Sequence, residues 1–189
     1  MEEKLSNSIY TDIRDKIIRG EIDDRTFLTE SDLAKQYGVS KAPIRDALHL
    51  LCSNGYLVSY PRKGYMVKLY NRTEIEQMQQ VRLHLEKLSI ELVIANATDE
   101  QISALRKYNE QYEYVTDPDM SNNARFHMGL ARISGNPYLA ATLEPLIHNI
   151  SRYWIEANFD FRHYLAIIDA LLQRDLPLAL QALEADFTR

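Results

Sequence analysis

The sequence is poor in cysteine and has no long apolar run. Cys52 is the only cysteine among 189 residues, which excludes a disulfide within the chain and leaves no cysteine framework for zinc. No stretch approaches the roughly 20 consecutive apolar residues that a membrane-spanning helix needs. The opening MEEKLSNSIY is acidic and lacks the apolar centre of a secretory signal. We therefore expect a soluble, cytoplasmic protein that does not enter a membrane.

Positive charge is also scarce, but it is unevenly distributed. The net charge is −5, yet residues 1–70 hold 11 Lys and Arg against 10 Asp and Glu, whereas residues 71–189 hold 11 against 17. Between residues 35 and 68, Asp46 is the only acidic residue, and the basic ones are Lys35, Lys41, Arg45, Arg62, Lys63 and Lys68. A local basic patch is enough to contact phosphates on an acidic protein. The charge therefore permits nucleic-acid binding by the first 70 residues.

The first 53 residues carry the pattern of three helices. Apolar residues at helical spacing predict an amphipathic helix over residues 5–19. Thr29 is a suitable N-cap for a short second helix, which Gly38 ends in the left-handed conformation. Ser40 caps a third helix, whose first turn tolerates Pro43 because the missing N–H had no helical partner there. A short helix, a glycine turn and a second capped helix are the order of a helix-turn-helix motif.

The helix that Ser40 begins has two different faces. Its buried face is predicted to contain Ile44, Ala47, Leu48 and Leu51. Lys41, Arg45 and His49 are spaced by four and fall on another side. Such a stripe is ordinarily a solvated surface, but after a helix and a tight turn we favour DNA recognition, in which the first residues of the helix contact base edges. Arg45 is the best candidate for a guanine or phosphate contact, with Ser40, Lys41 and Ala42 nearby.

A two-stranded hairpin is predicted after this helix. Residues 56–58 alternate as a strand, residues 61–64 form a basic tip, and residues 65–67 return. A charged tip protects strand edges in many proteins. Beside a recognition helix, contact with the DNA backbone or the minor groove is the favoured role.

The stretch SDLAKQYGVSKAPIRDALHLLCSNGYLV resembles the winged-helix signature of the GntR family of bacterial transcription regulators. The fragments L-A-x-x-x-G-V-S, P-I-R-D-A-L and G-Y-L-V carry the resemblance, which covers residues 5–68. It implies DNA contacts at the start of the short helix, in the recognition helix and in the wing. These positions are Ser31, Ser40, Lys41, Ala42, Arg45, Arg62, Lys63 and Gly64. An arginine and an Arg-Thr pair are common in the family where this chain has Ser31 and Lys41-Ala42, so the operator sequence does not transfer.

The sequence pattern of residues 71–189 predicts helices joined by short connections. The first is predicted to begin at Asn71 or Thr73, and its apolar positions are Ile75, Met78, Val81, Leu85, Leu88, Leu92 and Val93. Further helices are expected over residues 98–114, 117–135, 136–157 with a kink at Pro145, 160–172 and 177–187. The chain is thus predicted to be mainly α, with a winged helix-turn-helix in residues 1–70 and a six-helix antiparallel bundle in residues 71–189.

This second part resembles the FCD domain of the FadR-like branch of the GntR family. The motif Arg82-Leu83-His84-Leu85-Glu86 and the turn Ser134-Gly135-Asn136-Pro137 carry the resemblance, together with the region around His127. Many FCD domains hold a divalent metal with an Asp, a His one turn later and two further His. Here the corresponding positions are Asn123, His127, Tyr164 with His163 one residue early, and Asp186.

Two alternatives stay open for this region. The resemblance implies a metal set of Asn123, His127, His163 and Asp186, whose oxygen-rich character favours manganese or iron over zinc or nickel. Alternatively, the polar residues hydrogen-bond to one another in the bundle core without a metal. The resemblance also implies an anionic effector that pairs with Arg82, Arg125 or Arg132, or completes the coordination of the metal.

The sequence as a whole predicts a homodimeric regulator that reads a palindromic DNA operator. Repression relieved by a small carboxylate effector is the favoured mechanism. One alternative is a metal-dependent enzyme or metal sensor built on the bundle, and another is a winged helix that binds protein. We see no pairing of a nucleophile with a base, no phosphate-binding loop and no complete metal set, so we expect no enzyme activity.

Overall fold

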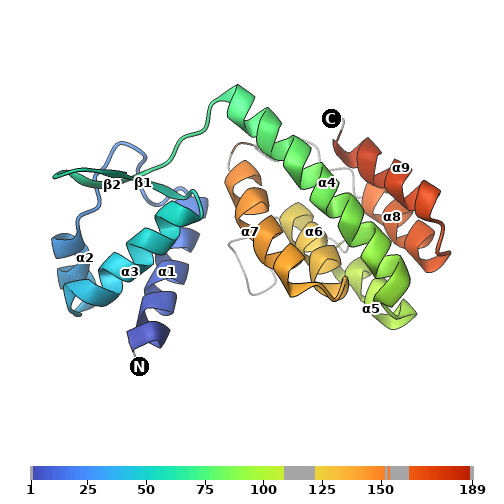
Figure 1. The fold of residues 1–189 in the computed structure, drawn as a ribbon, viewed down its shortest axis with the longest axis horizontal. Coiled ribbons are helices and arrows are strands. Elements are labelled where there is room, and N and C mark those ends of the chain that lie inside the picture. Colours follow the sequence, from blue (N-terminus) through green and yellow to red (C-terminus); the bar gives the residue numbers. More distant parts are fainter. Residues whose placement is uncertain (1, 109–121, 152, 154–161, 188–189) are drawn as a thin grey trace. The chain divides into compact units, whose positions relative to one another are not determined.

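The computed structural model describes residues 2–108, 122–151, 153 and 162–187 (Figure 1). The chain is mainly helical and divides into two compact units, residues 1–71 and 72–189. The boundary lies one residue from the predicted division at residues 70 and 71. Among the described helices, none combines the length and the apolarity that crossing a bilayer requires.

The first unit is a winged helix-turn-helix. It consists of α1 (Glu2–Ile18), α2 (Glu30–Tyr37), α3 (Lys41–Ser53), β1 (Leu57–Tyr60) and β2 (Gly64–Val67). The helices and the hairpin enclose one apolar core, to which α1 contributes three isoleucines and α3 contributes its predicted buried face. The buried members are Ile9, Ile13, Ile17, Leu33, Ile44, Ala47, Leu48, Leu51, Tyr56, Leu57, Tyr65 and Val67.

Local hydrogen bonds set the ends of α2. The Thr29 hydroxyl oxygen accepts from the backbone N–H of Asp32 at 3.1 Å, as expected of an N-cap. Gly38 has φ +67° and donates its N–H to the Ala34 carbonyl, so it ends the helix in the left-handed conformation. Ser40 occupies the N-cap position of α3, but its side chain makes no capping hydrogen bond. The predicted turn is confirmed, while the Ser40 hydroxyl is left available to another partner.

The wing is joined to the segment before α2. β1 and β2 pair antiparallel, and an isolated bridge links Leu28 to Tyr65 in β2. Leu28 N–H donates to the Tyr65 carbonyl at 2.7 Å, and Tyr65 N–H donates to the Leu28 carbonyl at 2.9 Å. Gly64 has φ +118°, and a Cβ at this position would lie 2.4 Å from the Leu28 oxygen. Glycine is therefore required where the wing approaches the rest of the unit.

The second unit is a helical bundle. In the part of the chain that the structure describes, its six α-helices are α4 (Arg72–Asn96), α5 (Asp99–Ser103), α6 (Asn122–Ile133), α7 (Pro137–Ser151), α8 (Arg162–Leu172) and α9 (Leu176–Phe187). The helix predicted over residues 98–114 is wrong in extent, because α5 passes into a 3-10 helix, η1 (Ala104–Tyr108). Residues 109–121 and 154–161, which include parts of four predicted helices, lie outside the described residues.

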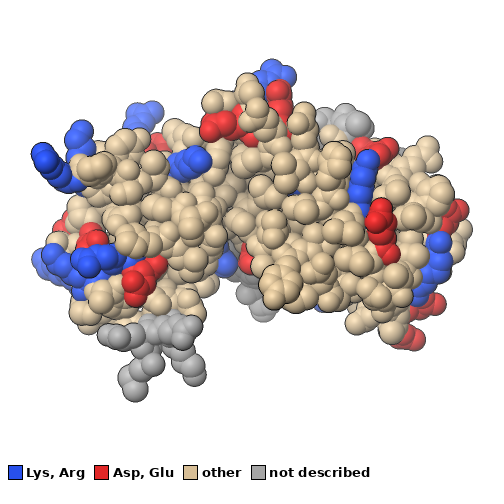
Figure 2. Space-filling model, viewed as in Figure 1, with Lys and Arg blue, Asp and Glu red and all other residues tan. Residues whose placement is uncertain are grey.

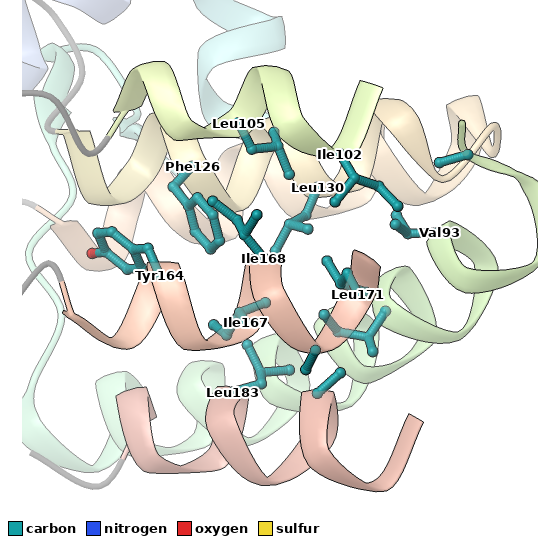
Figure 3. Close-up of a cluster of buried hydrophobic side chains, with 14 residues drawn as sticks. Val93, Ile102, Leu105, Phe126, Leu130, Tyr164, Ile167, Ile168, Leu171 and Leu183 are labelled. Carbon is teal, nitrogen blue, oxygen red and sulfur yellow. The ribbon is translucent and has the colours of Figure 1, made fainter. Parts of the chain in front are cut away.

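Two apolar clusters stabilise the bundle. The larger one joins α4, α5, η1, α6, α8 and α9, and Figure 3 shows Phe126, Tyr164, Ile168 and Leu171 within it. The smaller one lies between α6 and α7, where Ala124, Met128, Ala131, Leu139, Leu143 and Ile147 are buried. Helix α6 therefore packs against apolar residues on two sides, and the polar side chains on it that are buried need partners from other helices.

The predicted buried stripe of α4 is wrong in part. Val81 and Leu88 are 53% and 38% exposed, although Val93 is buried as predicted. The residues that α4 buries are Arg82, Glu86, Ser89, Ile90 and Val93. The spacing of apolar residues predicted the wrong buried face for α4, because that prediction places charged residues in solvent. In the structure, an arginine and a glutamate of α4 are buried. This polar strip forms one side of the site described below.

Candidate nucleic-acid interface and buried polar site

The start of α3 presents its predicted DNA-contacting residues to solvent. Ser40, Lys41, Ala42 and Arg45 are all exposed. The opposite face of the helix is buried in the core through Pro43, Ile44, Ala47, Leu48 and Leu51. The core therefore fixes the helix, and its N-terminal turns remain accessible for contact with base edges.

The remaining predicted contact residues lie at the start of α2 and in the wing. Ser31 is exposed in the first turn of α2, and Arg62 and Lys63 are exposed at the hairpin tip, where Arg62 has φ +66°. The Lys63 ammonium lies 5.9 Å from the centre of the Phe27 ring. Figure 2 shows basic side chains gathered over the hairpin tip and over the end of the unit formed by α2 and the start of α3.

Glu30, a residue that no sequence motif indicated, connects these parts. Its carboxylate accepts from Arg45 Nε at 2.9 Å and from Arg45 Nη2 at 2.8 Å. The Arg45 side chain is 52% exposed and that of Glu30 is 24% exposed. The hydrogen bond from Arg45 lowers the pKa of Glu30, and that carboxylate raises the pKa of Arg45, so both remain charged. No pattern in the sequence pairs residues 15 positions apart on different helices.

These contacts make one continuous surface within the first unit. Gly64 lies against Leu28 and Thr29 at the root of the wing, and Glu30 follows them directly. Glu30 in turn binds Arg45 on α3. Since the two Glu30 bonds use two of the five N–H groups of the guanidinium, the others are available to an outside acceptor. The arrangement holds a partly exposed arginine in a fixed orientation beside the wing.

The second unit contains a buried network of charged side chains. His127 on α6 is fully buried, and its Nδ1 hydrogen-bonds to Glu86 Oε2 on α4. On the other side of the ring, His127 Nε2 lies 3.1 Å from Asp186 Oδ2 on α9. Arg82 Nε donates to the second Glu86 oxygen at 2.5 Å, and its guanidinium lies 4.8 Å from the Phe187 ring centre. Three helices, α4, α6 and α9, are therefore joined through His127.

The network favours the charged forms of its members. Burial by itself would raise the pKa of Glu86, but the charges of Arg82 and His127 hold that pKa below its ordinary value. Burial would likewise lower the pKa of His127, but Glu86 and the hydrogen bond to Asp186 raise it above its ordinary value. An imidazole that faces a carboxylate at each nitrogen donates at both, which is the protonated form.

Asn123 and Tyr164 line the Nε2 side of His127. Asn123 Nδ2 donates to the Tyr164 hydroxyl at 2.5 Å and lies 3.5 Å from His127 Nε2. The Tyr164 ring stacks on Phe126 with centroids 4.4 Å apart, at one end of the apolar cluster in Figure 3. Burial, with the charge of Asp186, raises the pKa of Tyr164, so its hydroxyl remains protonated.

On α8, the predicted metal ligand His163 is followed directly by Tyr164. Tyr164, not His163, projects from α8 toward Asn123, because successive residues of a helix point about 100° apart. The structure brings Asn123, His127 and Asp186 together as predicted. In the described part of the chain, no three His, Cys, Asp or Glu side chains are grouped so as to hold one metal ion.

The residues around His127 fit a divalent metal poorly. Among the described residues, the strong donors on the Nε2 side are His127 and Asp186, whereas Asn123 is neutral and the Tyr164 phenol keeps its proton. A neutral amide and a phenol therefore stand where the family pattern has an aspartate and a histidine.

The three predicted effector arginines are not brought together. Arg82 joins the network, but its charge is paired with Glu86. Arg125 lies two residues from both Asn123 and His127, so it projects from the opposite side of α6. Arg132 is exposed near the end of the same helix. These arginines were predicted as alternatives, and Arg82 alone of the three joins the buried network among the described residues. Which of them pairs with an effector stays a prediction.

Comparisons with known proteins match both units. Residues 5–67 match the family described as bacterial regulatory proteins, gntR family, and residues 77–189 match the FCD domain. The uncharacterized HTH-type transcriptional regulator YdhC of Bacillus subtilis (strain 168) is 31% identical over 148 residues, covering 74% of this chain and 66% of that protein. The gluconate operon transcriptional repressor of Bacillus licheniformis is 28% identical over 196 residues, covering 95% of this chain and 80% of its own.

The fold is likewise similar to that of a solved regulator. The structure of E. coli McbR/YncC matches with a TM-score of 0.79 and 22% identity, covering 97% of this chain and 93% of that chain. This likeness shows the fold, and the matches of both units show the family. The chain is therefore a DNA-binding transcription regulator of the GntR family, in the FadR-like branch that carries the FCD domain.

Proposed function

We propose that the protein is a cytoplasmic repressor that binds a palindromic operator as a homodimer and is released by a small metabolite bound in its helical unit. The observation that carries the DNA-binding part is the continuous surface from Gly64 through Glu30 to Arg45. A basic recognition helix and a basic wing tip lie on one unit, and core packing and hydrogen bonds fix both.

Repression and the effector class are supported by a named relative and by the charged groups of the bundle. One relative is named the gluconate operon transcriptional repressor, and gluconate is a small carboxylate. A carboxylate effector would need a positive group, so among the described residues it would have to replace Glu86 or Asp186 as the partner of Arg82 or His127. The effector would act by binding one arrangement of the bundle more tightly than another, which changes the spacing of two DNA-binding units in a dimer.

Arg45→Ala tests the recognition helix. We expect binding to an operator obtained by selection to weaken by about 1–3 kcal/mol, because a bidentate guanine contact contributes about that much discrimination. The control is Arg106→Ala, which removes one positive charge from the second unit, where Arg106 pairs with Asp169. Equal affinity and equal base preference for Arg45→Ala and the wild type would overturn the assignment of α3.

The effector part has its own test. The operator complex is titrated with single small carboxylates, sugar acids included, and release is followed by fluorescence anisotropy. We expect at least one carboxylate to release the wild type and to act less on His127→Gln. If neutral or cationic metabolites release the complex and carboxylates do not, the carboxylate class is wrong while the DNA-binding proposal stands.

A further inference from the structure

The buried network around His127 contains residues that differ from the metal ligands of the family. Each His127 nitrogen has a carboxylate partner, Glu86 on one side and Asp186 on the other. Asp186 comes from α9, the last described helix, and its side chain is only 7% exposed. Asp186, which stands where the metal-binding pattern of the family has a histidine, is thus buried and in direct contact with the imidazole.

The same contacts do what a metal ion does for a helical bundle. An ion held by several helices joins them and neutralises the charge of its ligands. Here His127 joins α4, α6 and α9 through its contacts with Glu86 and Asp186, and Arg82 donates to the second Glu86 oxygen. The four side chains therefore connect the three helices by direct hydrogen bonds, with no ion between them.

The remaining neighbours also have partners within the protein. Asn123 donates to the Tyr164 hydroxyl, and Tyr164 stacks on Phe126. An incoming divalent ion would have to displace the Asn123–Tyr164 hydrogen bond, and it would gain a neutral amide and a phenol in return. Both are weaker ligands for first-row divalent ions than the aspartate and histidine of the metal-binding pattern.

We propose that the network of Arg82, Glu86, His127 and Asp186 replaces the metal ion of metal-binding FCD domains, so that this bundle is metal-independent. The protein folds, and its last helix docks, without manganese, iron, nickel or zinc. The proposal does not depend on the identity of the effector or of the operator.

The first experiment measures metal in the wild-type chain. The full-length protein is purified without an affinity tag or a chelating column, dialysed against each divalent ion and then against buffer, and analysed by mass spectrometry of the elements. We expect far less than one ion per chain, and the same Tm with EDTA and with added Mn²⁺, Fe²⁺, Ni²⁺ or Zn²⁺. About one retained ion per chain, or a Tm that falls with EDTA, would overturn the proposal.

The second experiment restores the metal pattern in the same scaffold. The triple variant Asn123→Asp, Tyr164→His and Asp186→His should retain about one Zn²⁺ or Ni²⁺ per chain and show a Tm that rises with the metal. The same triple variant with His127→Ala is the matched control and should lose the response. A triple variant that folds only with metal also supports the proposal, and one that folds and ignores metal contradicts it. If the triple variant never folds, the metal content and the Tm of the wild type decide whether the proposal holds.

Discussion

Replacing Gly64 by alanine tests how the wing is held. Gly64 has φ +118°, and an added Cβ would lie 2.4 Å from the carbonyl oxygen of Leu28, which is a backbone atom that cannot rotate away. The two hydrogen bonds between Leu28 and Tyr65 lie beside this contact, at 2.7 and 2.9 Å. To accommodate the methyl group, the root of the wing must move away from the segment that leads into α2.

The cost has two parts. A residue other than glycine at positive φ costs about 1–2 kcal/mol. Separating Leu28 from Tyr65 weakens two backbone hydrogen bonds, each with a net contribution of about 0.5–1.5 kcal/mol. We expect Gly64→Ala to lower the free energy of unfolding of the first unit by about 2–5 kcal/mol. Gly20→Ala is the matched control, because Gly20 has φ +70° and no atom within 4 Å of an added Cβ. Gly20→Ala should therefore lower the free energy of unfolding only by the cost of a residue other than glycine at positive φ.

Cys52 provides an assay that reports on the first unit alone. It is the chain's only cysteine and is half-buried on α3, and burial raises the pKa of its thiol. The rate of thiol labelling in increasing urea therefore measures the opening of the unit that contains the wing. Equal losses of stability in Gly64→Ala and Gly20→Ala would refute the close contact between the wing and Leu28.

Three further predictions concern the two sites. Glu30→Gln removes the charge that orients Arg45, so discrimination between the operator and its single-base variants should fall more than affinity for unrelated DNA; unchanged discrimination would exclude a positioning role. Asp186→Asn should lower the free energy of unfolding of the second unit by about 1.5–3 kcal/mol, because a buried charged hydrogen bond is weakened. The control Glu184→Gln removes the partly exposed ion pair between Glu184 and Lys87 and should cost no more than about 1 kcal/mol in the same denaturation experiment. Equal losses would contradict the network. Lys63→Ala should reduce the slope of log K against log salt by about one, as expected for the loss of one phosphate contact, and an unchanged slope would place the wing tip away from the DNA backbone.

The first unit was well predicted from the sequence because local rules specify it. Thr29 caps α2 through its own side chain, and Gly38 ends that helix in a conformation that few other residues adopt. The wing tip and the buried face of α3 follow from turn residues and from the spacing of apolar residues. The pair of Glu30 and Arg45 could not be predicted, because it depends on how two helices pack.

The second unit was predicted in most of its described helices and in part of its site, where Asn123, His127 and Asp186 lie together. The apolar pattern of α4 placed Val81 and Leu88 inside, whereas the structure buries Arg82 and Glu86. A charged residue belongs to a core only when its partners are present, and those partners come from α6 and α9. The same limit applies to the choice between His163 and Tyr164, since a shift of one residue changes the direction of a helical side chain by about 100°.

Selection of binding sites from random double-stranded DNA tests the central claim most directly. The full-length protein is incubated with the library at a fixed salt concentration, and the bound sequences are amplified and read. We predict one enriched inverted repeat, whose half-site preference weakens when Arg45→Ala replaces the wild type. No enriched sequence, or a preferred sequence that Arg45→Ala leaves unchanged, would contradict the assignment of α3 and the wing as the surface that reads DNA.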